Sequence, residues 1–303
     1  MIGATTVLAA LLLDAWFGEP PRFHPLVGFG RLAGILECNI RSDSRMRGVI
    51  AVALLTLPFT FLAVLAGSVP CGYWVDGLVL YFSIGWTSLA EHAAKVRDAL
   101  MLDDLPRARK YLSRMVSRDT DRLGSTEISV ATVESVLENG NDAIFGAIFW
   151  FVAAGAPGVV FYRVANTLDA MWGYRNARYR NFGWCAARLD DLLNIVPARL
   201  TALSYALLGR FQPALRCWRK QAGAWKSPNA GPVIAAGAGS LGITLGGVAV
   251  YAGVATARPT LGEGALPDAM QIDRALHLIR RVLLLWLALL FCGGWIVDRF
   301  QTV

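Results

Sequence analysis

The sequence predicts an all-α fold, a polytopic helical membrane protein with a large cytoplasmic-side helical region and a hairpin broken by glycine and proline. Of its 303 residues, 55% are hydrophobic and 17% are charged, and the mean hydropathy is +0.46. The uncharged segment 48–75 exceeds the ~20 residues that a spanning helix needs. Basic residues are unevenly divided among the connections. We therefore expect a single integral membrane domain over residues 1–303.

Four segments are expected to span the membrane, near residues 2–16, 49–69, 75–90 and 282–298. The first has neither a basic N-terminal region nor a small-residue cleavage site, so we interpret it as a retained anchor and not as a cleaved signal peptide. The last two are short, but each contains an uncharged run, at 77–90 and 282–297. Their composition is that of membrane helices.

The arginines predict the orientation of these spans. Residues 70–74 contain no basic residue, many follow Glu91, and five follow the first apolar segment: Arg22, Arg31, Arg41, Arg45 and Arg47. By the positive-inside rule, 17–47 and the region after 91 face the cytoplasm. The net charge of +7 then reflects topology and contacts with anionic lipid or phosphate. Nucleic-acid binding is not expected, because the sequence has no basic cluster interleaved with aromatic residues.

Cysteine and histidine exclude several kinds of site. The five cysteines are scattered and never spaced as C-x-x-C, so neither a disulfide framework nor a zinc site is expected: Cys38, Cys71, Cys185, Cys217 and Cys292. The three histidines are equally dispersed, which argues against a histidine metal centre or a Ser/His/Asp triad. His24, before Pro25, remains a candidate for a single polar site residue.

The uncharged run 143–162 is predicted to enter the membrane and return. Residues 155–158, Gly-Ala-Pro-Gly, interrupt it and leave two arms of roughly a dozen residues, or ~18 Å each, which is short of the ~30 Å hydrocarbon core. A hairpin also keeps Arg178 and Arg188 on the same side as Arg118. The stretch 192–209 is left open between two arrangements, along the membrane interface or dipping inward.

Residues 91–142 form an amphipathic helical region whose last part carries acidic residues. Glu134, Glu138 and Asp142 follow each other at i, i+4 and i+8, so one helix places the three carboxylates on one face. Like charges so placed repel, and we expect either Mg²⁺ or an arginine partner, with Arg118 as a candidate. The alternative is a solvated acidic stripe.

A dense polar series in residues 166–201 predicts a reaction site. Charged and amide side chains are costly near hydrocarbon unless they pair, line a wet cavity or bind a ligand. The alternative is a solvated loop between two spans. The members of the series are Asn166, Asp169, Tyr174, Arg175, Asn176, Tyr179, Arg180, Arg188, Asp190, Asp191, Asn194 and Arg199.

Residues 237–242 match the dinucleotide-binding pattern G-x-G-x-x-G, with Glu263 downstream. The match is weak because no alternation of strands and helices surrounds it, and small residues at this density favour close packing of membrane helices. No P-loop sequence occurs. The glycine- and proline-broken segments also permit a transporter with discontinuous helices, although the sequence has no internal repeat.

Ten short segments, spread in order along the chain, carry a specific resemblance. They are Leu12–Asp14, Gly18–Pro21 with His24–Pro25, Arg118–Thr120, Val133–Val136 with Glu138–Asn139, Asn166–Asp169, Gly173–Tyr174 with Arg178–Tyr179, Phe182–Trp184, Ala187–Asp191, Pro197–Thr201 and Ser227–Gly231. Together they resemble the CobD/CbiB family of membrane-bound adenosylcobinamide-phosphate synthases in cobalamin biosynthesis. The resemblance runs from about residue 8 to 285.

The resemblance implies an ATP-dependent ligase that spans the cytoplasmic (inner) membrane of a bacterium several times. It joins a propionate carboxyl of a corrinoid, adenosylcobyric acid, to (R)-1-amino-2-propanol or its O-phosphate. A carboxylate is a poor electrophile, so ATP is expected to convert it into an acyl phosphate that the deprotonated amine attacks. Charge on the transferring phosphoryl group calls for Mg²⁺ and arginine. Other corrinoid-pathway enzymes are possible partners.

Roles for individual residues follow as hypotheses from this chemistry. Catalysis is assigned to Asp169, as a base for the amine, and to Asp190, Asp191, Glu134 and Glu138. Mg²⁺ is expected at Glu134, Glu138 and Asp142, or at Asp190 and Asp191. Substrate and phosphate binding is assigned to Arg118, Arg188, Arg199, Asn166 and Asn229, and corrin contact to Tyr174, Tyr179 and Trp184. Interfacial anchoring is the alternative for each aromatic residue.

The sequence departs from the family after Ser227–Gly231. The family usually has an aromatic residue and then a glutamate there, whereas residues 231–237 have neither. A non-catalytic scaffold of the same pathway is therefore a third alternative beside the ligase and the transporter.

Overall fold

The computed structural model describes residues 2–20, 24–69, 72–174 and 176–301. Arg22, Cys71 and Arg175, which enter the arguments above, lie outside these ranges. The chain divides into two compact units: unit 1 is Met1–Gly85, Asp142–Asn194 and Leu287–Val303, and unit 2 is Trp86–Asn141 and Ile195–Trp286. Within each unit, segments distant in the chain pack together. The single integral membrane domain stays a prediction.

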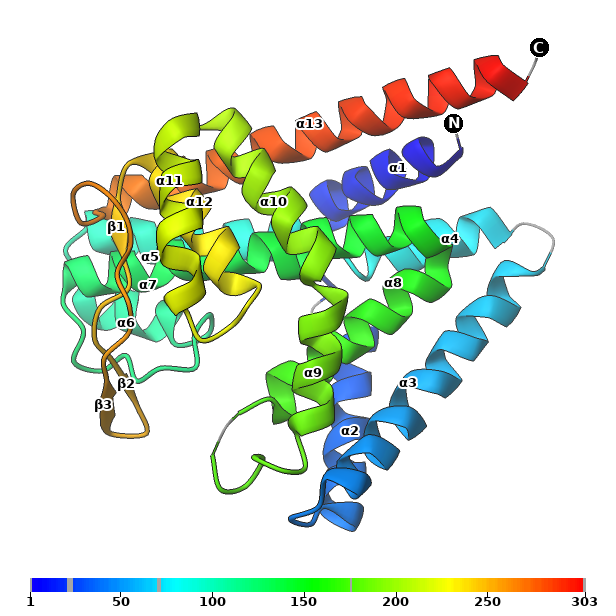
Figure 1. Cartoon of the computed structure of the whole chain (residues 1–303), viewed down its shortest axis with the longest axis horizontal. Helices are drawn as coiled ribbons and strands as arrows, with labels where there is room; N and C mark the ends of the chain where they lie inside the picture. Colours follow the sequence, from blue (N-terminus) through cyan, green and yellow to red (C-terminus); the bar gives the residue numbers. More distant parts are fainter. Residues whose placement is uncertain (1, 21–23, 70–71, 175, 302–303) are drawn as a thin grey trace. The chain divides into compact units, whose positions relative to one another are not determined.

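All regular secondary structure in the described residues of unit 1 is helical. It contains α1 (Ile2–Phe17), α2 (Pro25–Ile40), α3 (Arg45–Gly67), α4 (Gly72–Tyr81), the π-helical turn η1 (Asn141–Phe145), whose first residue belongs to unit 2, α8 (Gly146–Trp172) and α9 (Trp184–Leu193). The end of α13 (Ala269–Gln301) also belongs to it. Figure 1 shows α2, α3, α8 and α9 lying side by side.

Three stretches in the described part of the chain are long and apolar enough to cross a membrane: Arg45–Gly67, Ser125–Trp172 and Ala269–Arg299. The first and third contain most of the predicted spans 49–69 and 282–298, which supports the prediction of an all-α membrane protein. Helix α1 forms over the predicted first span, but its 16 residues make it shorter than these three. Orientation relative to the cytoplasm stays a prediction.

The segment 75–90 is two helices and not the single span that the sequence predicted. Helix α4 ends at Tyr81, and α5 begins at Trp86. Between them the backbone turns, and the amide of Gly85 donates to the carbonyl oxygen of Ala143 at 3.1 Å. This long-range hydrogen bond satisfies a donor that a continuous helix would have used itself.

The predicted break at 155–158 is present. Within α8, Ala154 and Gly155 leave the helical conformation, and Gly155 has φ +65°, a region that favours glycine. The chain then reverses, as the hydrogen bond from the hydroxyl of Tyr162 to the carbonyl oxygen of Asp142 at 3.1 Å shows. A methyl group on Gly158 would lie 2.5 Å from the carbonyl oxygen of Trp150. The two arms therefore pack against each other as a hairpin.

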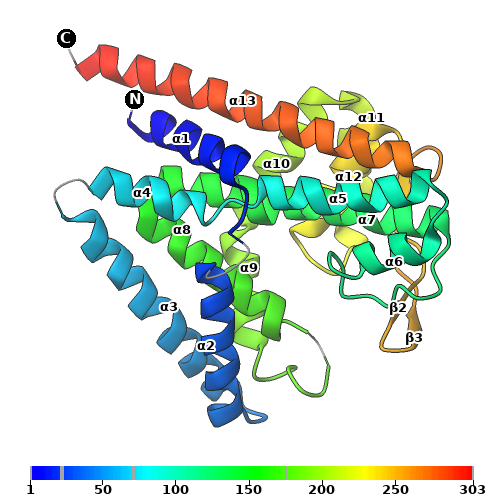
Figure 2. The same cartoon turned by 180° about the vertical axis from the view of Figure 1, so that it is seen from behind.

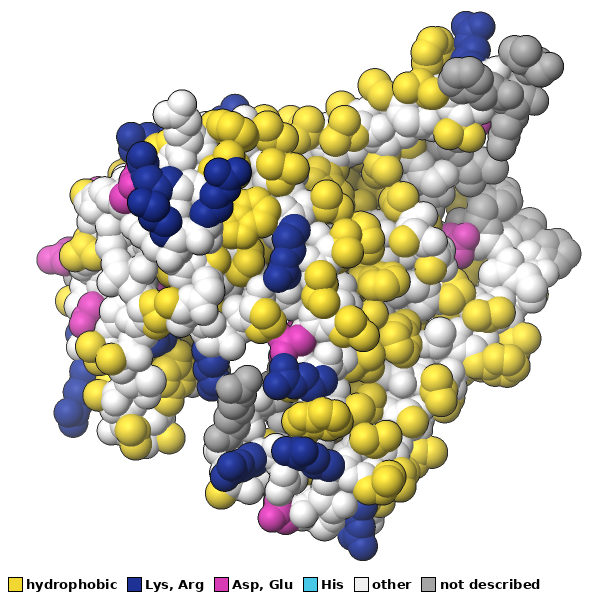
Figure 3. Space-filling view, viewed as in Figure 1, with side chains coloured by type: hydrophobic (Ala, Val, Ile, Leu, Met, Phe, Trp, Pro, Cys, Tyr) yellow, Lys and Arg dark blue, Asp and Glu magenta, His cyan; other side chains and the backbone are white. Residues whose placement is uncertain are grey.

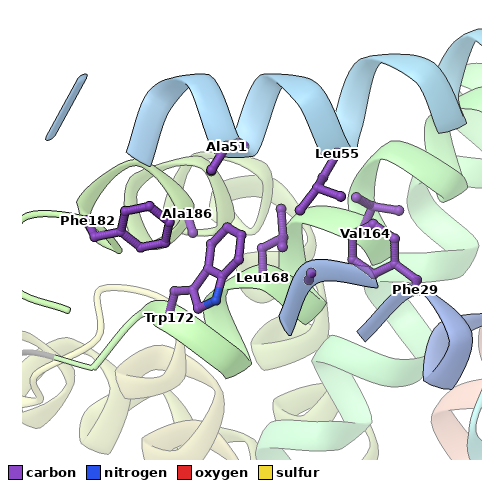
Figure 4. Packing of buried hydrophobic residues seen from close by; sticks show 10 residues of the cluster. Phe29, Ala51, Leu55, Val164, Leu168, Trp172, Phe182 and Ala186 are labelled. Atoms are coloured by element: carbon purple, nitrogen blue, oxygen red, sulfur yellow. The ribbon is translucent and has the colours of Figure 1, made fainter. Parts of the chain in front are cut away.

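The core of unit 1 is an apolar cluster between α2, α3, α8 and α9 (Figure 4). Trp172 and Leu168 of α8 are fully buried there. The opposite face of α3 is exposed, and Figure 3 shows hydrophobic side chains gathered over it at the lower right. A helix with one face in a protein core and an exposed apolar face is typical of a membrane segment.

Unit 2 contains eight further elements of helix and four short strands among its described residues. The helices are α5 (Trp86–Met101), α6 (Leu105–Leu112), α7 (Ser125–Gly140), α10 (Ile195–Leu208), α11 (Phe211–Gln221), η2 (Ala222–Ala224), α12 (Ala230–Leu241) and the beginning of α13. The strands form two antiparallel pairs, β1 (Thr244–Leu245) with β4 (Leu261–Gly262) and β2 (Ala249–Tyr251) with β3 (Val254–Thr256). Figure 2 shows α5 and α7 packed side by side.

Helix α12 explains the glycine-rich pattern at 237–242. All of its residues are buried, and the hypothetical methyl group of Gly237 would lie 2.7 Å from the side chain of Leu137. Gly242 ends the helix with φ +68°. The glycines therefore permit close helix packing, and since no strand precedes them, the dinucleotide alternative is wrong.

Candidate active site

A buried hydrogen-bond network in unit 1 surrounds Asp190. Asn166 donates to Asp190 Oδ1 at 3.0 Å, and Asn194 donates to the same oxygen at 3.1 Å. Asn166 lies on α8, Asp190 lies on α9, and Asn194 follows α9 one turn after Asp190. We call these three residues, together with Tyr162 and Arg163, the Asp190 cluster.

Tyr162 and Arg163 connect the Asp190 cluster to the first arm of the hairpin. Arg163 Nη1 donates to Asn166 Oδ1 at 3.2 Å and to the carbonyl oxygen of Asp142 at 3.1 Å. The hydroxyl of Tyr162, which is fully buried, lies 3.1 Å from the same carbonyl oxygen and 3.0 Å from Asn194 Oδ1. The reversal of the chain at Gly155 therefore brings these residues together.

Carboxylates from inside and outside the cluster surround Arg163. Arg163 interacts electrostatically with Asp142, Glu19 and Asp190. Burial raises the pKa of Asp190, the hydrogen bonds from Asn166 and Asn194 oppose this, and the neighbouring charge of Asp191 raises the pKa further. One arginine thus faces several carboxylates, an arrangement able to attract a cation or a cationic substrate.

The remaining predicted residues of unit 1 lie on the surface or at helix ends. Asp191 forms an ion pair with exposed Arg188 at 3.6 Å. Asp169 lies in the last turn of α8, beside Gly173. Tyr174 is 45% exposed, and Trp184 is exposed with the Arg45 guanidinium 5.3 Å from its ring centre. Such exposed aromatic rings are available both for ligand contact and for interfacial anchoring.

Glu37 forms a second buried network in unit 1, and the sequence did not single it out. Its Oε1 accepts from Tyr179 OH at 3.0 Å and from Arg178 Nη2 at 2.7 Å, and its Oε2 accepts from Trp172 Nε1 at 3.1 Å. Burial alone would raise the pKa of Glu37, but these hydrogen bonds outweigh it and lower the pKa. Tyr179, predicted to contact a corrin ring, therefore anchors the loop after α8 to α2.

In unit 2, Glu134 is paired with arginines. Its carboxylate accepts from Arg118 Nη2, from Arg258 Nη1 at 2.9 Å and from the amide of Gly246 at 2.8 Å. All three side chains are mostly or fully buried, at 2% exposure for Glu134 and 11% for each arginine. The predicted partner Arg118 is confirmed. Since two cations already balance Glu134, the acidic-stripe alternative is wrong for this residue.

Glu138 and Asp142 do not continue the arrangement of Glu134. Glu138 is half-buried on α7, and Asp142 lies in the π-helical turn η1, where the helical register changes. In the described part of the chain, no group of three or more His, Cys, Asp or Glu side chains is placed to hold a metal ion. Binding of Mg²⁺ by Glu134, Glu138 and Asp142 stays a prediction, and the arginine partners of Glu134 weigh against it.

Arg199 and Asn229, both predicted from the sequence, lie together in unit 2. Arg199 Nη1 donates to Asn229 Oδ1, and Asn229 is buried. The hydroxyl of Ser227 accepts from the amides of Asn229 and Ala230, at 3.3 and 3.1 Å, which fixes the turn that begins α12. This pair links α10 to the start of α12.

Five residues of these networks were missed by the sequence reasoning: Glu37, Tyr162, Arg163, Trp172 and Arg258. Arg163 stands three positions before Asn166, on the same helix face, and that spacing was an available signal. Glu37 and Arg258 have partners more than 100 positions away. No local pattern marks such contacts.

Comparisons with known proteins agree with the order of motifs in the chain. The family model described as "CobD/Cbib protein" matches residues 7–279. A relative from Stutzerimonas stutzeri, named "Cobalamin biosynthesis protein CobD", is 55% identical over 96% of this chain and 98% of its own length. Proteins with the same name from Chromobacterium violaceum and Mycobacterium tuberculosis are 53% and 40% identical, over 97% and 92% of this chain and the same shares of their own lengths. No solved structure matches. With a family match over nearly its whole length, the chain belongs to the CobD/CbiB family.

Proposed function

We propose that this chain is an ATP-dependent amide ligase of cobalamin biosynthesis. The reaction joins a propionate carboxyl of adenosylcobyric acid to (R)-1-amino-2-propanol or its O-phosphate. The relatives named for cobalamin biosynthesis support the pathway. The observation that supports catalysis in this chain is the Asp190 cluster, in which Arg163, Asn166 and Asp190 converge beside a membrane hairpin.

The chemistry has two balanced steps. A carboxylate oxygen of the corrinoid attacks the terminal phosphorus of ATP, the bond to ADP breaks, and an acyl phosphate forms. The amine nitrogen then attacks the acyl carbon, phosphate leaves with the electron pair of the C–O bond, and the amine gives up a proton. Substrate carboxylate and amine must both be positioned, because this orientation supplies much of the rate enhancement.

The residues of unit 1 suit these requirements. The carboxylates around Arg163 attract the ammonium form of the amine, and Asp169, one turn after Asn166, is positioned in sequence to accept its proton. Exposed Arg188 supplies a cation for phosphate near Asp190. The exposed rings of Tyr174 and Trp184 offer flat apolar area for the corrin.

The residues also fit a magnesium ion bound together with ATP. Mg²⁺ in nucleotide sites is usually held by one or two carboxylates and otherwise by phosphate oxygens and water. Asp190 and Asp191 supply such a pair, and Asp190 is already oriented by two amides. When bound, the ion would neutralise charge on the transferring phosphoryl group.

The test is product formation by the purified chain in lipid vesicles. Adenosylcobyric acid, ATP, Mg²⁺ and either aminopropanol or its phosphate are supplied, and each component is omitted in turn. Amide product that requires all of the components supports the ligase. Corrinoid binding with neither product nor ATP hydrolysis would support a scaffold instead, and accumulation of corrinoid inside the vesicles would support a transporter.

A matched pair of variants ties the reaction to the Asp190 cluster. Asp190→Asn keeps the size of the side chain but removes its charge, and it should abolish most of the product. Asp103→Asn is the control, since Asp103 is exposed and its φ of 54° is a conformation that asparagine accepts. Equal activity of both variants would reject the cluster as the reaction site.

A further inference from the structure

Helix α10 carries a line of exposed hydrophobic side chains. Val196 is 50% exposed, Leu200 39%, Leu203 40% and Leu207 55%. Their spacing of four, three and four residues places them on one face of the helix. We call them the outer face of α10.

The other side of α10 is part of the core of unit 2. Thr201 donates to Asn141 Oδ1 at 3.0 Å, and the fully buried Tyr205 donates to the carbonyl oxygen of Leu137 at 3.0 Å. Ala198 and Ala202 are fully buried. The outer face is apolar as well, so it requires apolar surroundings of its own, which the core of unit 2 does not supply.

The length of α10 restricts what covers the outer face. Its 14 residues extend about 21 Å at 1.5 Å per residue, which is short of a hydrocarbon core of about 30 Å. By itself, the helix is therefore too short to cross a bilayer. An apolar helix of this length is compatible with a position along the membrane interface.

The contact between α10 and α13 indicates how deep α10 lies in the bilayer. Trp286 Nε1 donates to Ser204 Oγ of α10 at 3.0 Å. Exposed Arg280 and Arg281 precede the uncharged run 282–297 of this candidate span, and Trp286 follows Arg281 by five residues, or about 7.5 Å. Interfacial helices bury their apolar face about 5–10 Å deep, and tryptophan is enriched at that level.

The direction of α10 and its flanking charge agree with this depth. In Figure 1, α10 crosses the first half of α13 and does not run alongside it. Exposed Arg210 follows the helix, and α11 continues with basic residues that face solvent. Basic residues beside an apolar face complement anionic headgroups.

We propose that α10 is an interfacial helix whose outer face lies among the lipids of the leaflet from which α13 enters the bilayer. The partner of this surface is the bilayer itself, with acyl chains against Leu200, Leu203 and Leu207. This assignment decides between the two arrangements that the sequence left open for residues 192–209, and it does not depend on the ligase reaction.

The experiment uses the unaltered chain in vesicles of phosphatidylcholine and phosphatidylglycerol. One sample contains a phospholipid with a photoactivatable diazirine in its acyl chain, and a second is treated with a water-soluble diazirine. Labelled residues are located by mass spectrometry. Helix α3, with its exposed apolar face, is the positive reference. Leu102 is the matched control, since it is a 72% exposed leucine of unit 2 that stands beside Asp103.

The expected result is lipid label on 196–207 at the level found on α3, and none above background on Leu102. Label from the water-soluble reagent should be lost from the outer face and present on Leu102. Two outcomes would overturn the proposal. Water-soluble label on the outer face would place it in solvent. Absence of both labels, with cross-links between copies carrying Leu203→Cys, would assign the face to a second copy of the chain.

Discussion

Single side chains determine the chemistry of the Asp190 cluster. Two amide groups, from Asn166 and Asn194, donate to one oxygen of Asp190, so the carboxylate is fixed in direction. The sequence singled out Asn166 and Asp190 because both belong to a polar series, and polar side chains are costly to place near hydrocarbon in a chain that is otherwise apolar. Their contact, between residues 24 positions apart, could not be derived from spacing, since it depends on how α8 and α9 pack.

Asn166→Asp tests this contact. The change replaces the amide donor by a second carboxylate at 3.0 Å from Asp190 Oδ1, so like charges oppose each other where a hydrogen bond existed. We expect amide formation to fall by roughly tenfold or more, about 1.4 kcal/mol in transition-state free energy. Product formation at saturating substrates measures the effect. Asn39→Asp, at an exposed position on α2, should retain activity, and equal rates for both variants would contradict the role of Asn166.

Glu37 predicts a dependence of stability on pH. Its folded-state pKa lies below the ordinary value of 4.5, so its stabilisation is present above that value and is lost as the pH falls through the folded pKa. Glutamine at this position keeps one acceptor oxygen and replaces the other by an amide donor, so either Trp172 or Tyr179 loses its acceptor, at a cost of about 2 kcal/mol.

Thermal unfolding of Glu37→Gln in detergent checks this dependence. The variant should melt several degrees below the unaltered chain at pH 7, and the difference should shrink as the pH approaches 4 and below. Glu91→Gln, at an exposed site where the carboxylate pairs with Lys95 at 3.5 Å, provides the control. A difference that stays constant from pH 7 to 3.5 would show that the charge of Glu37 does not contribute.

At the scale of elements, local chemistry predicted some breaks and missed others. The hairpin break was predictable because glycine and proline act locally: Gly155 adopts a positive φ, and Pro157 has no backbone donor. The break between α4 and α5 was not, since Gly85 gains its partner from Ala143, 58 positions away. At Glu134 the arginine partner Arg118 was predicted from the sequence, but the second arginine, Arg258, was not, since it comes from the segment after β3.

Gly146→Ala tests the packing of the hairpin. A methyl group at this position would lie 2.2 Å from the hydroxyl of Tyr162, so Tyr162 must move away from Asn194. We expect a loss of stability of about 1–3 kcal/mol, as for other overpacked interiors, together with reduced activity. Unfolding temperature and product formation measure the two effects.

Gly34→Ala is the matched control for the hairpin. Gly34 lies within α2, and nothing lies within 4 Å of the position of its added methyl group. This variant should be unchanged or more stable by about 0.5–1 kcal/mol, because alanine favours helix. If the two variants behaved alike, close approach of the hairpin arms at Gly146 would be refuted.

For the whole molecule, composition predicted the class and the structure supplied the organisation. Hydrophobic content and charge-free segments predicted helices that cross a membrane, because water and hydrocarbon impose strong requirements on backbone and side chains. The division into two units was not predictable, since each unit is built from segments that alternate along the chain. Residues 231–237, which lack the usual glutamate of the family, form the buried start of α12.

The central claim is that the chain forms an amide through an acyl phosphate. The most direct measurement supplies adenosylcobyric acid labelled with ¹⁸O in its free propionate carboxyl, together with ATP, Mg²⁺ and the amine, and follows the label by mass spectrometry. The account predicts one ¹⁸O atom in the released inorganic phosphate for each amide formed. Absence of amide, or amide with the label in AMP, would contradict it.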